Sequence, residues 1–283
     1  MKVAIAGSTG FLGQALVKSS NDLQWITLDR HMLYRDPVSL GDALKEAKVV
    51  INLAGSPIIG RWNKKNRKLM LNSRVTVNRN LVQAINGIVP KPELFITASA
   101  IGYYDDHHIH GEDSTFAGTG FLSELTSQWE SPLESLDRSV RAVRARIGIV
   151  LGQQGGMLGQ FTRFARLGII PMIGSGRQVI SFINIEDFTA AIRYIVDHGS
   201  GGVYNLCTPF PVDHATFMKT LAALTGVRLV PRIPGVFLAP VMGDSRVMVT
   251  RGQHVVPERL MAEGFTFKYP RVEDAMENLI TTS

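Results

Sequence analysis

The chain has 283 residues, 45% of them hydrophobic and 19% charged, which suits one large domain or two closely joined lobes and excludes a disordered chain. No apolar run approaches the roughly 20 residues that span a bilayer, and the first residues lead at once into a strand and a glycine turn instead of a signal peptide, so we expect a cytoplasmic protein. The net charge of +6 leaves two alternatives open, a basic surface for nucleic acid or membrane and a basic pocket for an anionic small molecule.

The first half of the chain alternates β-branched apolar runs with amphipathic stretches, a pattern typical of a parallel sheet covered by helices. The predicted strands are almost continuously apolar, as strands are when both faces of a sheet are buried: Val3–Ala6, Trp25–Leu28, Val49–Leu53, Leu94–Ala98 and Ala142–Leu151. The helices predicted between them are Phe11–Ser19, Leu40–Ala47, Asn66–Ile85 and Leu122–Leu136.

The second half is richer in glycine and proline. Its predicted elements are a helix at Phe161–Leu167, a strand at Val179–Ile183, a helix at Asp187–Val196 and a strand at Gly202–Leu206. We expect residues 1–206 to form a nucleotide-binding domain and residues 207–283 a small C-terminal domain on the substrate side. Residues 152–178 are expected to contribute to the substrate lobe.

Three glycines, Gly7, Gly10 and Gly13, follow the first strand directly and open a helix. In this context the first glycine permits a tight turn, the second lets a pyrophosphate approach the backbone and the third lets the helix pack on the strand. The helix N-terminus offers N–H groups and a partial positive charge to the phosphates. The sequence therefore predicts a Rossmann-like, doubly wound parallel α/β sheet that binds a dinucleotide.

Asp29 and Arg30 end the second strand, where the adenosine ribose of such a cofactor lies. A carboxylate here selects NAD through the ribose 2′-hydroxyl, whereas a guanidinium accommodates the 2′-phosphate of NADP. Since the sequence carries both groups, the residues alone leave the choice open.

Further motifs follow the glycine turn in order: Asn52-Leu-Ala-Gly55, Ser99-Ala-Ile-Gly-Tyr103-Tyr104, Arg146-Ile-Gly-Ile-Val150-Leu-Gly152, Gly174-Ser-Gly-Arg177 and Phe182-Ile-Asn-Ile-Glu-Asp187. Together they resemble the extended short-chain dehydrogenase/reductases. Arg61-Trp62, Ser73-Arg74, Trp129-Glu130 and the C-terminal Gly252–Phe267 region resemble, more narrowly, the atypical branch labelled epimerase family or nucleoside-diphosphate-sugar epimerase.

This resemblance implies an NADP(H) cofactor, with NAD(H) as the alternative. The expected cofactor contacts are Gly7, Thr9, Gly10, Phe11, Leu12, Gly13, Asp29, Arg30, Leu53, Ala54, Arg74 and Val150. For Arg74, an ion pair on the helix surface is an equal alternative. The resemblance also suggests a homodimer that pairs the helices at Asn66–Ile85 and Leu122–Leu136.

Enzymes of the wider family use a Ser, a Tyr and a Lys four residues after the Tyr; the lysine lowers the tyrosine pKa and the serine holds the oxyanion. Ser99 is in place, but none of the six tyrosines is followed by lysine at the fourth position. Counted back from Trp129-Glu130, the usual Tyr and Lys positions hold Leu122 and Thr126. Tyr103 and Tyr104 are therefore the substitute acid–base candidates, with a role as pocket wall as the alternative.

Three other features of the sequence bear on the site. The run Asp105-Asp-His-His-Ile-His110 fits no zinc spacing, so we expect a solvated loop and no metal. Arg177 is a candidate to bind an anionic substrate, with an ion pair between domains as the alternative. Cys207, the one cysteine, is expected to be a small buried apolar residue.

Two functions remain in view. The first is an NAD(P)-dependent oxidoreductase or epimerase acting on a small hydroxyl- or carbonyl-bearing molecule, such as a nucleotide sugar. The second is a catalytically weak or inactive NADP(H)-binding protein with a regulatory, redox-sensing role. We expect neither a nucleic-acid partner nor a membrane partner, because no aromatic residues interleave the basic clusters and no long apolar segment is present.

Overall fold

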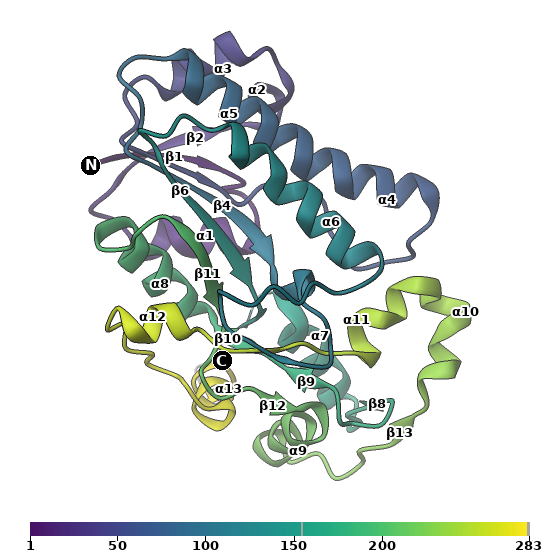
Figure 1. The fold of residues 1–283 in the computed structure, drawn as a ribbon. Coiled ribbons are helices and arrows are strands. Elements are labelled where there is room, and N and C mark those ends of the chain that lie inside the picture. The colour runs from purple at the N-terminus through teal and green to yellow at the C-terminus, as the bar shows by residue number, and fades with distance from the viewer. Residues whose placement is uncertain (154, 282–283) are drawn as a thin grey trace.

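The computed structural model describes residues 1–153 and 155–281. Its centre is a six-stranded sheet in the order β11-β6-β4-β3-β1-β2, with every pairing parallel (Figure 1). The strands are β1 Lys2–Ala6, β2 Gln24–Leu28, β3 Val49–Asn52, β4 Leu94–Ala100, β6 Arg141–Ile147 and β11 Gly202–Leu206. The chain builds outward from β1 to β2 and then crosses to β3 on the other side, so the strand order reverses between β1 and β3. This confirms the predicted doubly wound α/β fold.

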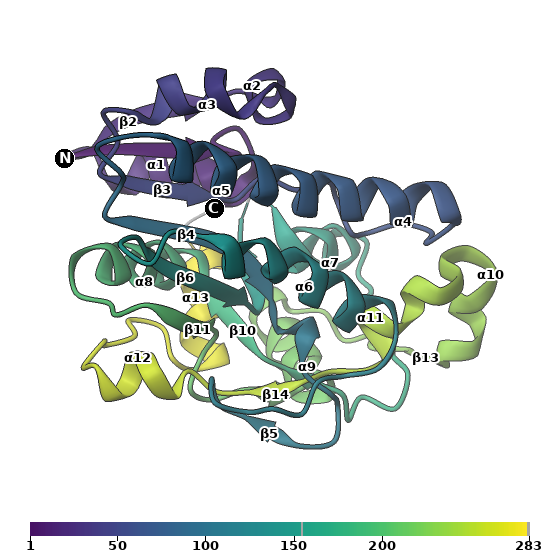
Figure 2. The same ribbon diagram turned by 45° about the horizontal axis from the view of Figure 1, so that its top comes forward.

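Helices cover both faces of the sheet, which is why the strand sequences are apolar throughout. One face packs on α1 (Phe11–Ser19) and α8 (Ile185–Asp197), and the other on α3 (Pro37–Leu44), α5 (Val77–Gly87) and α6 (Phe121–Glu130). Figure 2 shows α3 and α5 on one side of β1, β3 and β4, with α8 on the other side of the sheet. Both cores are fully buried; Ile5 and Phe95, for example, have no exposed surface.

Several predicted elements differ in detail. The helix predicted at Leu122–Leu136 ends at Glu130, the helix predicted at Leu40–Ala47 lies at Pro37–Leu44, and the strand predicted at Val179–Ile183 is divided into Val179–Ile180 and Phe182–Asn184. The expected helix at 66–85 starts earlier, at α4 (Lys64–Leu71), and passes through a π-helical turn, Asn72–Thr76, into α5. The single strand predicted at Ala142–Leu151 is wrong: it is broken at Gly148 into β6 and β7 (Ile149–Gly152). A Cβ on Gly148 would lie 2.4 Å from the carbonyl oxygen of Ser181, so the backbones touch there, and β7 leaves the main sheet to pair with β10 (Phe182–Asn184).

A lobe lies beside the carboxyl ends of the strands. It consists of α7 (Gly156–Arg166), β8 (Met172–Ile173), α9 (His214–Thr225) and β13 (Arg232–Ile233), and it shares a core with α13 (Val272–Thr281). Helix α7 begins five residues before the predicted Phe161, and the sequence analysis did not anticipate α9 or α13. The remaining elements are short: α2 Arg30–Tyr34, η2 Ile101–Tyr103, β5 Ile109–His110, η3 Ser131–Ser135, β9 Val179–Ile180, β12 Val212–Asp213, η4 Gly235–Leu238, α10 Ala239–Met242, η5 Gly243–Arg246, α11 Val247–Thr250, β14 His254–Val255 and α12 Glu258–Ala262.

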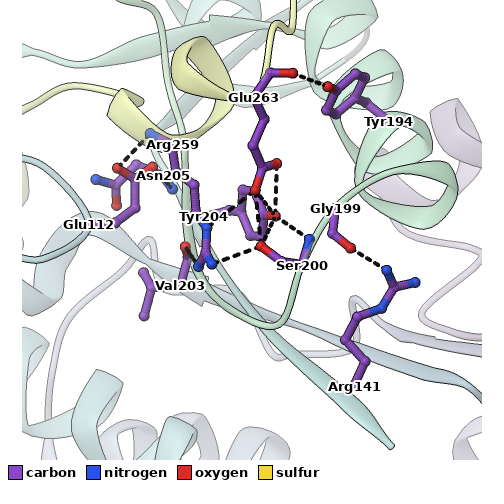
Figure 3. Close-up of polar contacts among 10 residues, drawn as sticks. All are labelled: Glu112, Arg141, Tyr194, Gly199, Ser200, Val203, Tyr204, Asn205, Arg259 and Glu263. Carbon is purple, nitrogen blue, oxygen red and sulfur yellow. Dashed lines mark hydrogen bonds and ion pairs between the residues drawn. The ribbon is translucent and has the colours of Figure 1, made fainter.

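The C-terminal region returns to the edge of the main sheet. In α12, the Arg259 guanidinium donates to the carbonyl oxygen of Val203 at 3.0 Å and lies over the Tyr204 ring (Figure 3). The Tyr204 hydroxyl donates to Glu263, 2.8 Å away, and accepts from the backbone N–H of Ser200. Some residues after 206 therefore belong to the lobe, whereas others, such as Arg259 and Glu263, contact β11. These contacts position the lobe against the sheet.

Candidate functional site

The glycine turn between β1 and α1 lies directly against the end of β3. Gly7 has φ +85°, and a Cβ there would lie 2.8 Å from the backbone nitrogen of Ala54 and equally close to Leu53. A Cβ on Gly13 would lie 2.1 Å from the Gly7 carbonyl oxygen. Gly10 precedes α1 without a side-chain cap, so the first N–H groups of this helix are left for another acceptor. The turn therefore has the close backbone approach and free donors that a pyrophosphate requires.

Phe11 and Val150 connect this turn to the lobe. The Phe11 ring packs under the loop that enters α7, since a Cβ on Gly152 or on Gly155 would lie within 2.7 Å of it. Val150 is buried in β7, 9% exposed. The carbonyl oxygen of Thr9 accepts a hydrogen bond from the side chain of Gln14, which closes the turn.

Asp29 and Arg30 lie at the start of α2, beyond β2. One carboxylate oxygen of Asp29 accepts a hydrogen bond of 2.8 Å from the Met32 N–H and so caps this helix. Arg30 is exposed and forms no ion pair with any described residue. At this strand end, the Asp29 carboxylate already accepts a hydrogen bond from the helix, whereas the Arg30 guanidinium has no ion-pair partner among the described residues.

Arg74 is a buried cation without a carboxylate partner in the described chain. Only 5% of it is exposed; its guanidinium stacks on the Trp129 ring and donates to the Ser56 carbonyl oxygen at 3.0 Å, while its Nε has no partner among the described residues. A Cβ on Gly55 would lie 3.0 Å from the guanidinium carbon. Burial lowers the pKa of Arg74 to about 10. The surface ion pair considered above is not formed.

Ser99, Glu130 and Arg146 form a buried polar cluster at the ends of β4 and β6. Ser99 Oγ donates to Glu130 at 2.5 Å, and Arg146 donates two hydrogen bonds of 2.9 Å to the same carboxylate. All three residues are at most 7% exposed. Although burial by itself opposes charge on Arg146, its hydrogen bonds to Glu130 raise the pKa of the guanidinium overall. The Ser99 hydroxyl is thus a donor to Glu130 and not to an oxyanion.

The positions that hold Tyr and Lys in the wider family lie on the same face of α6 as Glu130. Leu122 packs against Gly102, and the Thr126 hydroxyl donates to the Leu122 carbonyl oxygen at 2.7 Å. Glu130 follows Thr126 by four residues, which is one helical turn. Sequence reasoning missed the roles of Glu130 and Arg146, although both stand in motifs that it quoted. The signal in the sequence was the spacing of four residues between Glu130 and Thr126, the position that holds Lys in the wider family.

Tyr103 and Tyr104 differ sharply. Tyr104 is 1% exposed, its hydroxyl donates to Asn205 at 3.0 Å, and burial raises its pKa. Tyr103 is half-buried, with its ring 3.6 Å from the guanidinium carbon of Arg146, and its hydroxyl has no hydrogen-bond partner in the described chain. Tyr104 therefore lies in the core with its hydroxyl donating to Asn205, and its role as an acid–base group stays a prediction.

The histidine run is only partly the solvated loop that was expected. His107 and His108 are exposed, but His110 is fully buried in β5, stacked on Tyr104 at 4.7 Å and within 2.7 Å of the Ser114 hydroxyl. For His110 the prediction was wrong, because pairing of β5 with β14 covers it. In residues 1–153 and 155–281, no group of three His, Cys, Asp or Glu side chains is arranged to hold a metal.

Two residues named in the sequence analysis remain to be located, Arg177 and Cys207. Arg177 is exposed in the loop after β8 and forms no ion pair with another described residue, so the interdomain alternative is not formed there. Cys207 is completely buried, which confirms its assignment as a core residue, and burial raises its thiol pKa.

Comparison with known proteins agrees with this arrangement. Residues 3–207 match the model of the NAD dependent epimerase/dehydratase family, and residues 233–279 match a domain of unknown function, DUF1731. The chain belongs to the NAD-dependent epimerase/dehydratase family. It is 33% identical to epimerase family protein YfhF of Bacillus subtilis over 99% of this chain and 98% of that protein.

Solved structures of epimerase-family and related proteins share the fold. The human epimerase family protein SDR39U1, solved with NADPH, superposes with a TM-score of 0.91 at 28% identity, over the full length of both chains. A dTDP-4-dehydrorhamnose reductase from Clostridium acetobutylicum superposes with a TM-score of 0.81 at 14% identity, covering 100% of this chain and 99% of that one. This second similarity shows the fold alone.

Proposed function

We propose that this epimerase-family protein binds NADPH across the ends of β1 and β3, with the pyrophosphate at the turn of Gly7, Gly10 and Gly13. The observation that carries the proposal is the buried Arg74. A buried cation without a carboxylate is costly, and an anionic ligand beside Gly55 would offset that cost. Gly55 follows Ala54, which touches Gly7, so the arginine and the glycine turn would act on one ligand.

Arg30 supports the phosphorylated cofactor. It is exposed and unpaired with any described residue, whereas Asp29 already caps α2. A guanidinium at this strand end binds a 2′-phosphate through charge-assisted hydrogen bonds. The NADPH in the human relative is consistent with this choice.

The bound nicotinamide would supply or accept a hydride for a small hydroxyl- or carbonyl-bearing substrate. In this chain, Tyr103 is the group proposed to move the accompanying proton, because its hydroxyl has no partner in the described chain and its ring is fixed by Arg146. The Glu130–Arg146 pair would position Tyr103 without touching the substrate. Arg177 remains a proposed contact for an anionic substrate.

A second candidate function is favoured by the Ser99–Glu130 hydrogen bond. With Ser99 donating to Glu130 and with Leu122 and Thr126 in the Tyr and Lys positions, none of these three described residues is preorganised to stabilise an oxyanion. Such a site would hold NADPH without rapid turnover, as a redox-sensing protein does.

A thermal-shift titration with NADPH, NADP, NADH and NAD tests cofactor binding. Ligand at about 100 times its Kd adds roughly 2.7 kcal/mol to the free energy of unfolding, which corresponds to a rise in Tm on the order of 5 °C. We expect this rise with NADPH and a smaller one with NADH. Arg30→Gln should remove the preference for NADPH, whereas Arg35→Gln, directly after the same short helix, should retain it. No shift with any of the four would overturn the proposal.

A further inference from the structure

The net positive charge of the chain is confined to the lobe. Residues 155–185 and 214–243 contain no Asp or Glu and six basic residues: Arg163, Arg166, Arg177, Lys219, Arg228 and Arg232. The rest of the chain has 24 basic and 24 acidic residues, so it is neutral overall. All six cations are exposed, and none is in an ion pair with a described residue.

The two segments are distant in sequence but fold together. Strands β8 and β13 pair in parallel, Ile169 forms a bridge with Leu229, and the Ile170 N–H donates to the Leu229 carbonyl oxygen at 2.9 Å. Arg166 of α7 and Thr225 of α9 line the same hollow, so the ends of these helices are neighbours. Figure 1 shows α9, β8 and β13 together at the lower edge of the molecule.

Exposed apolar side chains lie among these cations. Leu167 is 75% exposed, Leu229 55% and Phe164 48%, and Ile169 and Leu224 are also exposed. We define the cationic–apolar patch as these five residues with three of the arginines: Arg163, Phe164, Arg166, Leu167, Ile169, Leu224, Arg228 and Leu229. Exposed apolar side chains on the same two paired segments as exposed cations, none of them in an ion pair with a described residue, indicate a binding surface.

We propose that the cationic–apolar patch binds the surface of an anionic phospholipid membrane. Arginines without acidic partners are attracted to anionic headgroups, and protruding Phe and Leu side chains gain free energy when they enter the acyl boundary. Nucleic acid fits less well, because its phosphates would leave Leu167 and Leu229 without an apolar partner.

Such binding needs no transmembrane segment. None of the helices in the described chain combines the length and hydropathy required to cross a bilayer. The sequence expectation of no membrane partner rests on the lack of a long apolar run, which does not bear on attachment at the surface. The proposal does not depend on the proposed function of the cofactor site.

The patch lies one helix away from the glycine turn. Helix α7 begins against Phe11 and ends at Arg166, and its 11 residues span about 16 Å. A membrane bound at the C-terminal end of α7 would therefore lie at the opposite end of this helix from the cofactor turn.

Co-sedimentation of the purified full-length protein with vesicles tests the proposal. The two compositions are phosphatidylcholine alone and phosphatidylcholine with about one third phosphatidylserine, the latter at low and high salt. We expect binding to the anionic vesicles only, and loss of most of it at high salt. Failure to bind anionic vesicles at low salt, or equal binding to neutral ones, would overturn the proposal.

Matched variants locate the surface. Because each cation near an anionic membrane adds about fivefold to binding, the double variant Arg163→Gln/Arg228→Gln should bind about 30-fold more weakly. Lys64→Gln/Lys65→Gln removes two exposed charges from α4 and should have little effect. Leu167→Asn should weaken binding about tenfold, whereas Val38→Asn, at a site equally exposed at 76%, should not.

The thermal unfolding transition of each variant, measured without ligand, checks that it is folded. Equal losses in the two charge variants would show attraction to net charge alone and would overturn the assignment to this patch. Concentration-dependent self-association that Leu167→Asn abolishes, without vesicle binding, would identify the patch as an interface between copies of the chain and would also overturn it.

Discussion

The Ser99 hydroxyl donates a 2.5 Å hydrogen bond to the carboxylate of Glu130, and this contact changes the chemistry available at the end of β4. In the wider family that this chain resembles, the serine faces the substrate and a Tyr–Lys pair follows on the neighbouring helix. Here the helix supplies a carboxylate one turn beyond the Lys position, and Arg146 neutralises it. The serine, carboxylate and arginine form a satisfied buried network that holds β4, β6 and α6 together.

Glu130→Gln tests the stability contribution of this network. Removing the charge leaves Arg146 buried without a counter-ion, so we expect the free energy of unfolding to fall by about 3 kcal/mol. Urea denaturation measures it. Glu124→Gln, on the exposed side of the same helix, should change stability by less than about 0.5 kcal/mol. Equal stability of the two variants would show that the pair is not stabilising.

Arg74→Met separates binding from folding. Because the arginine is a buried cation with no acidic partner in the described chain, its loss should leave the unliganded protein about as stable as before. The affinity for NADPH should fall by at least about tenfold, the loss of one charge-assisted contact. Calorimetric titration with NADPH and thermal unfolding without it give the two values. An unchanged NADPH affinity would contradict a role for Arg74 in the cofactor site.

Tyr103→Phe and Ser99→Ala distinguish the two proposed functions. If Tyr103 moves the proton, its variant should lose at least about 100-fold in NADPH-dependent reduction of a carbonyl substrate while keeping cofactor affinity. Ser99→Ala should cost about 1 kcal/mol of stability through the lost hydrogen bond and retain turnover. Single-turnover oxidation of NADPH across a panel of aldehydes and ketones is the assay. Absence of turnover in the parent protein, with NADPH still bound, would favour the redox-sensing function.

His214 predicts a pH dependence of stability. It is 2% exposed at the start of α9, its Nδ1 has no partner among the described residues, and burial lowers its pKa to about 4. The unfolded chain, with a His pKa near 6.5, therefore binds more protons than the folded one between about pH 4 and pH 6.5. Stability should fall as the pH drops through this window, by about 2–3 kcal/mol from this residue.

The measurement is urea denaturation at several pH values for the parent and for His214→Leu. Acidic groups titrate in both proteins, so the difference between the two curves isolates His214. The variant should lose less stability below pH 6.5. Parallel curves would show that the buried imidazole is not protonated differently in the two states.

The sequence by itself determined the sheet and the cofactor turn. Strands such as Val3–Ala6 and Val49–Leu53 are apolar because both of their faces are buried, and that pattern is local. The conformation of Gly7 is also local, since a turn with φ +85° leading into a helix selects glycine. The signals for these features are carried by a few consecutive residues, and their predictions agree with the structure.

Only the tertiary structure decided the partners of the polar residues. Ser99 and Arg146 lie 47 positions apart and meet Glu130 because β4 and β6 pair in register. His110 is buried by β14, and the six basic residues of the lobe are brought onto one part of the molecule by pairing of β8 with β13. Charge and hydroxyl pairing depends on which distant backbones lie side by side, and a single sequence carries no periodic signal for that.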